Sequence, residues 1–550
     1  MNHCKQCKQN FEITDADNEF YQTLKIPAPT LCPACRQQRR LTWRNERTLY
    51  KRKCDATGKD IVSVFSPDKP FTVYDNEYWY SDKWNPMDYG RDFDFNRPFF
   101  EQFNELNQKV PQLSRCVFQL QNCDFVNQVG CSKNCYLIFE ADFNENCYYS
   151  NNIFDSKVCI DLLMCVKCEL CYESIDCENC YNLKHSQGCK NSSDSWFLKN
   201  SIGCRNCFGC TNLRNKEYYF LNEKLGKDQY AEKLKAMDLG SYHYLQKARE
   251  NFLDFSQKYP HKYLQGNQNE NSTGNYLFNT QNCSNCFDSN TCQDCKYLYN
   301  CRYMKKCYDI TCFGNSGMTE FCCDNHCIEI NLRNVCFSDQ IWEGCNDIFY
   351  STLCVNNCRD LFGCVGLKHK QYCILNKQYS EADYKALRAK IVEHMQKTGE
   401  FGEFFPSKIS PFAYNETVAM EHFPLSKAEA IAKGYKWKDL DPKEYLKQKY
   451  KIPEDITQVP DTIFNEILAC VTCGKNYKII PEELKFYRLQ SLPIPLKCHD
   501  CRHKDRLKLR NKRTLYPRTC QKCSLPLETT YAPERLEPIY CEKCYQEAAL

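Results

Sequence analysis

The sequence lacks a long apolar segment. No run of eighteen apolar residues occurs in its 550 positions, so a hydrophobic transmembrane helix of ordinary length is not expected. No apolar leader follows Met1, because the polar residues Asn2 and His3 lead directly to Cys4. We therefore expect a cytoplasmic protein, in which cysteine thiols stay reduced or bind metal instead of forming disulfides.

The common short motifs of enzymes are also missing. There is no phosphate-binding glycine loop, no His-Glu-x2-His helix and no nucleophile elbow. The ten histidines are scattered, and we expect His185, His326 and His369 to be turn or surface residues and not catalytic bases. No paired carboxylates recur at fixed repeat positions, as they would in a polysaccharide-cleaving β-helix. The sequence therefore favours a protein without catalytic activity.

A strong excess of positive charge is absent as well. The formal net charge is +4 when every cysteine is counted as neutral. Each tetrathiolate zinc site would add four negative charges against two from the metal, so three such sites bring the net charge close to zero. A uniformly basic nucleic-acid-binding protein is excluded, and any contact with a polyanion must come from a local patch.

Cysteine, in contrast, is abundant, with 44 residues, and the two ends of the chain repeat one another. A shift of 466 positions superposes Cys4, Cys7, Cys32, Cys35 and Cys54 on Cys470, Cys473, Cys498, Cys501 and Cys520, with 21 of the 51 spanned residues identical. Each copy holds two Cys-x2-Cys pairs 24 residues apart. Four thiolates so spaced can complete a tetrahedral zinc site with no open position, which predicts one structural zinc ion in each copy.

The first copy reads CKQC…FEIT…NEFYQTLKIPAPTLCPACR. This pattern resembles the zinc-ribbon domain that many uncharacterised bacterial proteins carry, in which a Cys-x2-Cys, a Phe-Tyr pair, a proline and a Cys-x2-Cys-Arg recur. The resemblance covers about 35 residues at each end of the chain. It implies zinc binding and names no reaction.

A third zinc site is predicted at the C-terminus, where two more Cys-x2-Cys pairs stand 17 residues apart. Its ligands would be Cys520, Cys523, Cys541 and Cys544. The matching N-terminal positions are Cys54, Thr57, Asp75 and Tyr78. We expect this degenerate ribbon to hold no metal and its aromatic stretch VYDNEYWYSDKW to form a small apolar core. The expected cofactor is thus Zn²⁺, at about three structural ions per chain.

A basic stretch follows the second Cys-x2-Cys pair in both copies. If it is helical, its four arginines share one arc while leucine and threonine face away. The arginines are Arg36, Arg40, Arg44 and Arg47 in the first copy, and Arg502, Arg506, Arg510 and Arg513 in the second. Such a row can follow the phosphates of RNA or DNA, or pair with acidic side chains of a partner. The alternative is structural: a solvated face, or arginines that balance the zinc thiolates and hold the ribbon against a neighbouring domain.

The middle of the chain carries most of the other cysteines, often in the order asparagine, cysteine, aromatic residue. Cys135, Cys147, Cys159 and Cys171 stand twelve apart, and every cysteine from 135 to 210 lies at a multiple of three. A short fixed period with few helix-forming residues predicts a β-solenoid, with six or twelve residues forming one or two sides of a coil. The stretch from Phe208 matches that from Phe362 at an offset of 154, which predicts two arms.

Three roles are open for the arm cysteines. They can pack as small apolar side chains inside the solenoid, bind additional zinc, or hold an iron–sulfur cluster. The triplet Cys165-x2-Cys168-x2-Cys171 and a second one from Cys204 to Cys210 have ferredoxin-like spacing. Neither is followed by the proline that often accompanies such clusters, and a three-residue step is expected inside a solenoid, so packing is favoured.

The predicted fold is therefore mainly β with helical connectors: terminal zinc ribbons flank two cysteine-rich β-solenoid arms. The expected domains are 1–54 (zinc ribbon with basic helix), 55–95 (degenerate ribbon), 96–234 (helix and first arm), 235–275 (helical linker), 276–380 (second arm), 381–465 (helical, proline-rich connector), 466–519 (duplicated ribbon with basic helix) and 520–550 (C-terminal ribbon). The expected function is a zinc-binding, non-enzymatic scaffold for a macromolecular partner, either protein or RNA/DNA, with no membrane and no small-molecule substrate. The alternative is a metal-handling or iron–sulfur redox protein that uses the arm thiols.

Overall fold

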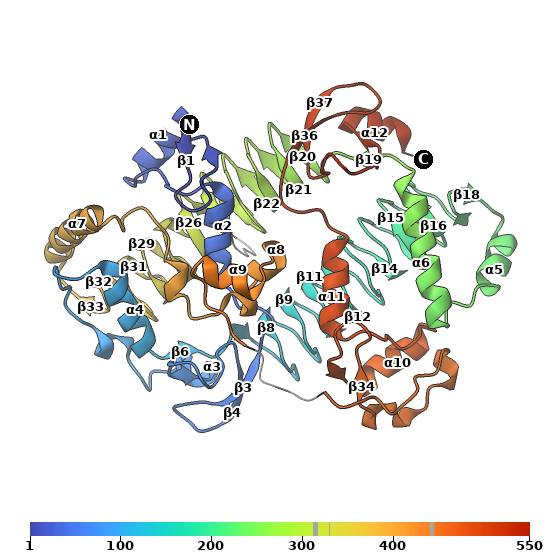
Figure 1. Cartoon of the computed structure of the whole chain (residues 1–550), viewed down its shortest axis with the longest axis horizontal. Helices are drawn as coiled ribbons and strands as arrows, with labels where there is room; N and C mark the ends of the chain where they lie inside the picture. The colour runs from blue at the N-terminus through green and yellow to red at the C-terminus, as the bar shows by residue number, and fades with distance from the viewer. Residues whose placement is uncertain (312–316, 329, 440–444, 550) are drawn as a thin grey trace.

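The computed structural model describes residues 1–311, 317–328, 330–439 and 445–549, and it consists of two β-solenoid arms with small cysteine-bearing modules at both ends (Figure 1). The predicted second arm, connector and C-terminal ribbon each include a few positions outside these ranges. We call residues 1–80 the N-terminal module and residues 467–549 the C-terminal module. The fold class expected from the sequence is confirmed: the chain is mainly β, with helices as connectors.

The first arm is a parallel β-solenoid. Its strands are β7 (Val117–Phe118), β8 (Asn127–Gly130), β9 (Phe139–Asp142), β10 (Glu145–Tyr148), β11 (Asn151–Phe154), β12 (Lys157–Ile160), β13 (Leu163–Val166), β14 (Tyr181–Lys184), β15 (Ser193–Lys199) and β16 (Phe208–Thr211), followed by the antiparallel pair β17 (Tyr219–Phe220) and β18 (Glu223–Lys224). Stacked residues are twelve apart, as in the pair Cys147 and Cys159. Twelve residues therefore make a whole coil, and the expectation that they form only one or two sides is wrong.

The corners of the coil explain the recurring triplet. Every third residue of the first arm has a positive φ, including Asn134 (53°) and Asn146 (54°), so a twelve-residue coil has four sides of three residues. Asparagine tolerates this left-handed conformation better than most residues. The cysteine after the corner is buried inside the coil, as Cys135 and Cys147 show, and the aromatic residue after it faces outward. In the Asn-Cys-aromatic triplet, asparagine thus forms the corner, cysteine fills the interior of the coil and the aromatic residue lies on its outside.

The second arm follows the same plan with longer coils near its end. Its strands are β20 (Gly266–Glu270), β21 (Gly274–Gln281), β22 (Cys286–Gln293), β23 (Arg302–Lys305), β24 (Tyr308–Thr311), β25 (Thr319–Glu320), β26 (Cys323–Ile328), β27 (Arg333–Cys336), β28 (Asp339–Ile341), β29 (Asn346–Phe349), β30 (Thr352–Cys354), β31 (Arg359–Phe362), β32 (Gln371–Ile374) and β33 (Lys377–Gln378). Tyr308 stacks on Cys323, and Cys323 on Cys336, so coils of fifteen and thirteen residues replace coils of twelve. These insertions are the reason that equivalent positions of the two arms differ by 148 early in the arms and by 154 late.

Helices lie at the ends of the arms and in the connectors. They are α4 (Phe99–Lys109), α5 (Lys227–Lys235), α6 (Tyr242–Gln257), α7 (Glu381–Thr398), α8 (Ala419–His422) and α9 (Lys427–Ala432). A turn separates α5 from α6, and α7 begins at the first residue of the connector predicted over 381–465. Within the described residues, no helix combines the length and the apolar character that a membrane span needs.

The two arms lie side by side and run in opposite directions. Asn300 donates a hydrogen bond to Glu140 (2.5 Å), and the guanidinium of Arg302 lies 4.6 Å from the ring centre of Phe154. Farther along, Lys190 lies 4.6 Å from the ring centre of Phe278. From Glu140 to Lys190 in the first arm, the contacted position in the second arm falls from Asn300 to Phe278, so the arms are antiparallel neighbours related by an approximate two-fold axis.

The duplication of the ends is preserved element by element. The N-terminal module contains β1 (Asn2–His3), β2 (Asn10–Phe11), α1 (Asp15–Thr23), α2 (Pro33–Leu41), β3 (Tyr50–Lys53), β4 (Asp60–Ser63) and α3 (Asn76–Tyr80). The C-terminal module contains β34 (Leu468–Ala469), β35 (Asn476–Tyr477), α10 (Pro481–Leu489), α11 (His499–Lys508), β36 (Tyr516–Thr519), β37 (Pro526–Thr529) and α12 (Glu542–Ala548). Each of these elements starts 466 positions after its counterpart. The sequence duplication is therefore a structural duplication.

The remaining short elements join the arms to the modules. They are β5 (Val73–Tyr74), β6 (Gln112–Leu113), β19 (His261–Lys262) and β38 (Ile539–Tyr540), with 3₁₀ turns at Pro86–Tyr89, Ser407–Ile409, Tyr414–Glu416, Ile456–Gln458 and Asp461–Asn465. Strand β19, in the linker between the arms, pairs in parallel with β38 of the C-terminal module. The proline-rich stretch after α7 buries Phe404, Phe405 and Phe412. It therefore packs against the core.

Candidate metal centres and the arginine contacts with the arms

Three groups of four cysteines bring their sulfur atoms together. Within each group all four sulfurs lie within 4.8 Å of one another: Cys4, Cys7, Cys32 and Cys35; Cys470, Cys473, Cys498 and Cys501; Cys520, Cys523, Cys541 and Cys544. One S···S distance in each group is 3.6 Å, 3.7 Å and 3.7 Å respectively. A tetrahedral ion with metal–sulfur bonds of about 2.3 Å requires S···S edges of roughly 3.8 Å. All twelve ligands predicted from the sequence thus stand in groups that fit a tetrahedral, thiophilic metal ion.

Local backbone geometry produces each site in the same way. The first Cys-x2-Cys lies in the tight turn between two short strands, where Lys8 adopts a positive φ of 63° and Gly474 one of 73°. The second pair begins a helix, with Cys32 as the N-cap residue of α2 and Cys35 in its first turn. A turn and a helix start both project two sulfurs toward one point. The result is a closed site that leaves no coordination position for water or substrate.

The degenerate ribbon keeps the geometry of the third site with different chemistry. The backbone N–H of Asp75 donates to the sulfur of Cys54 at 3.3 Å, as that of Cys541 does to Cys520, also at 3.3 Å. The Asp75 carboxylate accepts the Thr57 hydroxyl (3.1 Å) and the N–H of Tyr78 (2.9 Å). Hydrogen bonds to and from Asp75 therefore link all four positions that hold cysteines in the C-terminal copy. Nearby, Trp79 is fully buried and packs against the second arm.

The basic helix of the N-terminal module lies on the second arm, the arm that is more distant in the chain (Figure 1). Arg36 pairs with Asp309 (2.8 Å), and Arg40 pairs with Asp324 (2.7 Å) and, at 3.4 Å, with Asp309. Arg36 also lies over the ring of Tyr297, 5.3 Å from its centre. These arginines and aspartates are almost fully buried. The helix is thus fixed to the arm by ion pairs that exclude water.

The basic helix of the C-terminal module makes the equivalent contacts with the first arm. Arg502 pairs with Asp161 (2.8 Å), and Arg506 pairs with Asp161 (2.8 Å) and Glu173 (3.1 Å). Arg502 lies 4.9 Å from the ring centre of Tyr149. Asp161 and Tyr149 precede Asp309 and Tyr297 by the same 148 positions. The modules are therefore crossed, and each end of the chain binds the arm farther from it in sequence.

The last two arginines of each row contact the arm on which the basic helix itself does not pack. Arg44 pairs with Glu140 (3.1 Å), and the guanidinium of Arg47 lies 4.7 Å from the ring centre of Phe139. Their counterparts Arg510 and Arg513 both pair with Asp288 of the second arm. Each module therefore contacts both arms.

The helix expected to carry all four arginines on one solvent-facing arc is wrong in two respects. Helices α2 and α11 end at Leu41 and Lys508, before the last two arginines of each row. Residues on every side of α2 are buried, including Arg36, Arg40 and Leu41. The structural interpretation of the arginines, that they hold the ribbon against a neighbouring domain, describes these contacts. Binding of RNA or DNA by the same side chains stays a prediction and would require the internal ion pairs to open.

Two equivalent carboxylates sit in different electrostatic surroundings. Burial acts to raise the pKa of Asp288, but Arg510 and Arg513 outweigh it and lower the pKa to about 2. Its counterpart Glu140 is buried, lies near Glu46 and faces Arg44, and its pKa is raised to about 7. The two sides of the pseudo-symmetric structure should therefore respond to pH in opposite directions.

Most of the arm cysteines in the described residues are buried and donate hydrogen bonds to the backbone, whereas Cys116, Cys123 and Cys131 at the start of the first arm are half-buried. The thiol of Cys147, for example, donates to the carbonyl oxygens of Glu145 (3.4 Å) and Ser156 (3.3 Å). Burial raises the pKa of the Cys292 and Cys364 thiols well above the ordinary value, whereas hydrogen bonds from neighbouring cysteines lower the pKa of Cys180 and Cys283 to about 4. Among the described residues, the arm cysteines contribute to none of the four-sulfur groups. Their geometry is that of small apolar side chains in a core.

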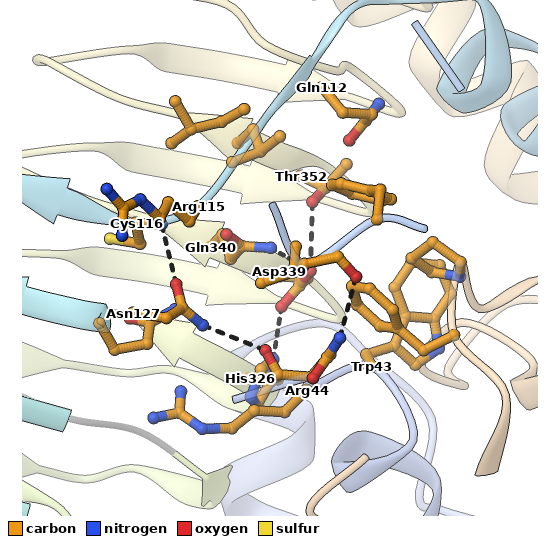
Figure 2. A pocket seen from close by; sticks show the side chains of 18 of the residues that line it. Trp43, Arg44, Gln112, Arg115, Cys116, Asn127, His326, Asp339, Gln340 and Thr352 are labelled. Atoms are coloured by element: carbon orange, nitrogen blue, oxygen red, sulfur yellow. Dashed lines mark hydrogen bonds and ion pairs between the residues drawn. The ribbon is translucent and has the colours of Figure 1, made fainter. Parts of the chain in front are cut away.

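A small polar pocket lies where the N-terminal module meets both arms (Figure 2). Its volume is about 40 Å³, enough for one or two water molecules. His326 approaches Asp339 at 2.5 Å, and Asp339 also accepts hydrogen bonds from Thr352 and Gln340. Burial lowers the pKa of His326, and the Asp339 carboxylate acts in the opposite direction. The expectation that His326 is a turn or surface residue is wrong; it is a buried residue held by a carboxylate thirteen positions later.

The fold and the sites together define a β-solenoid protein with tetrathiolate modules at both ends. Residues 2–42 match the family model described as "Probable treble clef domain", a small zinc-binding fold in agreement with the resemblance noted in the sequence. The matched segment ends one residue after α2, so it covers the first metal group and the helix that carries Arg36 and Arg40. No curated protein matches the chain.

Proposed function

We propose that this protein is a zinc-stabilised, non-enzymatic scaffold that binds a macromolecular partner. The single observation that supports it most is the crossed docking of the two Cys4 modules. The first four-cysteine group of each module orients a helix whose buried arginines pair with carboxylates of the far arm, as Arg40 does with Asp324. Zinc is the favoured ion because it accepts four thiolates in a tetrahedron and undergoes no redox change.

The closed sites support a structural role for the metal. A four-thiolate shell has no open position, so the ion would have no site for water activation or for a substrate. Its contribution is to fold and orient the modules. The paired arms then form a rigid surface, and rigid repeat surfaces of this kind commonly serve as binding platforms.

The metal content tests this proposal against the metal-handling alternative. We expect about three zinc atoms per chain after purification without added metal, measured by elemental analysis against protein concentration. A much larger metal content, or iron with absorption near 400 nm after anaerobic purification, would favour metal handling by the arm thiols. Because those thiols donate hydrogen bonds to backbone carbonyls, we expect neither.

The partner is sought by co-purification of the tagged full-length chain, with and without nuclease. A protein partner should remain after nuclease treatment, and an RNA or DNA partner should be lost. Substitution of Arg40 or Arg506 is a poor test of nucleic-acid binding, since both side chains are fully buried and the variants would change folding. Recovery of no stoichiometric macromolecule under either condition would contradict the scaffold function.

A further inference from the structure

We propose that a groove on the outer side of the second arm binds an acidic segment of the partner protein; the inference rests on the proposed scaffold function. The groove has a volume of about 680 Å³, within the range of a ligand-binding cleft. It lies between the end of α1, the β25–β29 side of the second arm and α7. Its floor is largely apolar, formed by Leu24, Phe349, Val392 and Phe401.

The rim of the groove is strongly cationic. It carries Lys25, Arg333, Lys385 and Arg388 against a single lining carboxylate, Asp347. Arg388 lies 4.4 Å from the ring centre of Phe349, and Arg333 lies 5.6 Å from that of Phe321. Of the four cations, Lys385 is the one with an ion pair among the described residues, an exposed contact with Glu381 on its own helix.

This pattern differs from that of the module arginines. Each of the eight arginines in the two basic stretches has a carboxylate partner inside the chain. Arg333 and Arg388, in contrast, contact aromatic rings and have no ion pair among the described residues. Asp360 lies close enough to Arg388 to interact with it electrostatically, and burial raises the pKa of its carboxyl. The four cations therefore face Asp347, Asp360 and Glu381, and the groove keeps an excess of positive charge.

The equivalent place on the first arm is covered by polypeptide of this chain. Ser491 stands 466 positions after Lys25, and both residues have a positive φ. A side-chain carbon built on Gly240 would lie 3.8 Å from the carbonyl oxygen of Ser491 and 3.2 Å from the carboxylate of Asp455. Ser241 and Asp455 form an antiparallel bridge at this point.

The covering segments complete an apolar cluster there. Leu239 and Ile456 are buried together with Trp196, and Trp196 stacks below Phe208 as Phe349 stacks below Phe362. Two segments of the chain, around Leu239 and Ile456, thus occupy on the first arm the position that is an open groove on the second. The shape of the groove accordingly fits an extended peptide.

The four rim cations are absent from the covered face. By the offsets of the duplication, Lys25, Arg333, Lys385 and Arg388 correspond to Ser491, Tyr181, Ala231 and Leu234. These four positions thus carry cations where the groove is open and none where the chain covers it, although one other cation, Lys184, lies 5.2 Å from the ring centre of Trp196 on the covered face. The covering segment itself carries two acidic residues, Glu454 and Asp455, between Ile452 and Ile456. An acidic, partly apolar segment is therefore the occupant that the groove suits.

The experiment uses a displayed library of random twelve-residue peptides, selected on the immobilised full-length chain. We expect enriched peptides to contain several Asp or Glu residues beside apolar ones. A synthetic labelled copy of the best peptide is then measured by fluorescence anisotropy. Its affinity should fall about tenfold or more in Arg333→Ala with Arg388→Ala, and it should weaken as salt rises.

The matched control is Arg205→Ala, which removes an exposed arginine from the first arm and should leave peptide affinity unchanged. All variants must retain the melting temperature and metal content of the native chain. Enrichment of neutral or basic peptides, or equal binding to native chain and groove variant, overturns the inference. Displacement of the peptide by inorganic phosphate or a single-stranded oligonucleotide at low concentration also overturns it, since the groove would then be an anion or nucleic-acid site.

The co-purification experiment separates this inference from the scaffold function. If a partner binds the native chain and the groove variant equally, the scaffold function stands and the groove is not its site. If no partner is recovered with the native chain, the scaffold function itself fails.

Discussion

The N-terminal module on the second arm and the C-terminal module on the first arm are two solutions of the same packing problem. Arg36 and Arg40 meet Asp309 and Asp324 in one; Arg502 and Arg506 meet Asp161 and Glu173 in the other. In both cases the basic helix of the module packs on the arm that is farther from it in the sequence. The two ends of the chain therefore hold the two arms together, and contacts of very large sequence separation define the architecture.

The differences between the halves are as informative as the likeness. The buried ion pairs between helix and arm are maintained at equivalent positions, because an unpaired charge in either place would be very costly. The second ribbon of each module, the surroundings of Glu140 and Asp288, and the outer faces of the arms have diverged. The conserved part of the duplication is thus the part that assembles the fold, and the diverged parts are where the two halves have acquired separate properties.

The largest expected effect comes from breaking one metal group in each half. Cys35→Ser and Cys501→Ser should each lose one metal ion of three and release the basic helix from its arm. The free energy of binding a structural zinc in small modules is about 10–16 kcal/mol, so both variants should unfold at much lower temperature. Metal analysis and thermal unfolding measure this. Cys54→Ser, in the degenerate ribbon, is the control and should keep the metal content of the native chain; similar melting of all three variants and the native chain would show that the metal groups do not support the fold.

A smaller, equal effect is expected from the equivalent arginines. Arg40→Met and Arg506→Met each remove one ion-pair partner from two buried carboxylates. Because Asp309, Asp324 and Asp161 keep second partners in Arg36, Arg39 and Arg502, we expect a loss of about 3 kcal/mol in the free energy of unfolding, the lower end for a broken buried pair. Denaturant titration of the full-length chain measures it. Lys53→Met removes an exposed pair with Asp60 and should cost less than about 1 kcal/mol. A large difference between the two arginine variants would contradict the equivalence of the halves.

The metal groups and the solenoid could be predicted from sequence because both depend on spacing. The cysteines at multiples of three mark an interior position, and the paired Cys-x2-Cys motifs mark a turn and a helix start. The ion-pair partners of the arginines could not be predicted, since those of Arg36 and Arg502 lie 273 and 341 positions away, at Asp309 and Asp161. A helical arc tells which side chains share a face; it does not tell what that face meets. The burial of His326 escaped prediction for the same reason.

The free energy of unfolding should depend on pH through Asp288 and Glu140 in opposite directions, each by an amount on the order of 2 kcal/mol. The pKa of Asp288 is lowered from 3.8 to about 2, so its contribution to stability is present above pH 4 and is lost as pH falls toward 2. The pKa of Glu140 is raised from 4.5 to about 7, so the folded state binds the extra proton and stability declines as pH rises from 4.5 to 7. Unfolding midpoints between pH 2 and pH 8 measure both.

Single substitutions assign the two parts of that profile. Asp288→Asn should abolish its share of the acid loss below pH 4 and leave the decline toward neutral pH, whereas Glu140→Gln should do the reverse. If both variants alter the same part of the profile, the opposite surroundings described for these carboxylates are incorrect.

The smallest expected change in stability, and the most direct comparison of the two halves, comes from rebuilding the lost site. Thr57→Cys, Asp75→Cys and Tyr78→Cys together restore, beside Cys54, the arrangement of Cys520, Cys523, Cys541 and Cys544. Because the hairpins, the helix starts and the N–H contact to the first sulfur at 3.3 Å coincide in both copies, we expect the metal content to rise from three ions to four. With the fourth site empty, stability should change little, since the fully buried Trp79 fixes this ribbon and the Thr57–Asp75 bond that is lost is exposed; binding of the fourth ion then adds stability. The same triple variant with Cys54→Ser should return to three ions, and a triple variant that stays at three would show that the ribbon has diverged in backbone geometry as well as in its side chains.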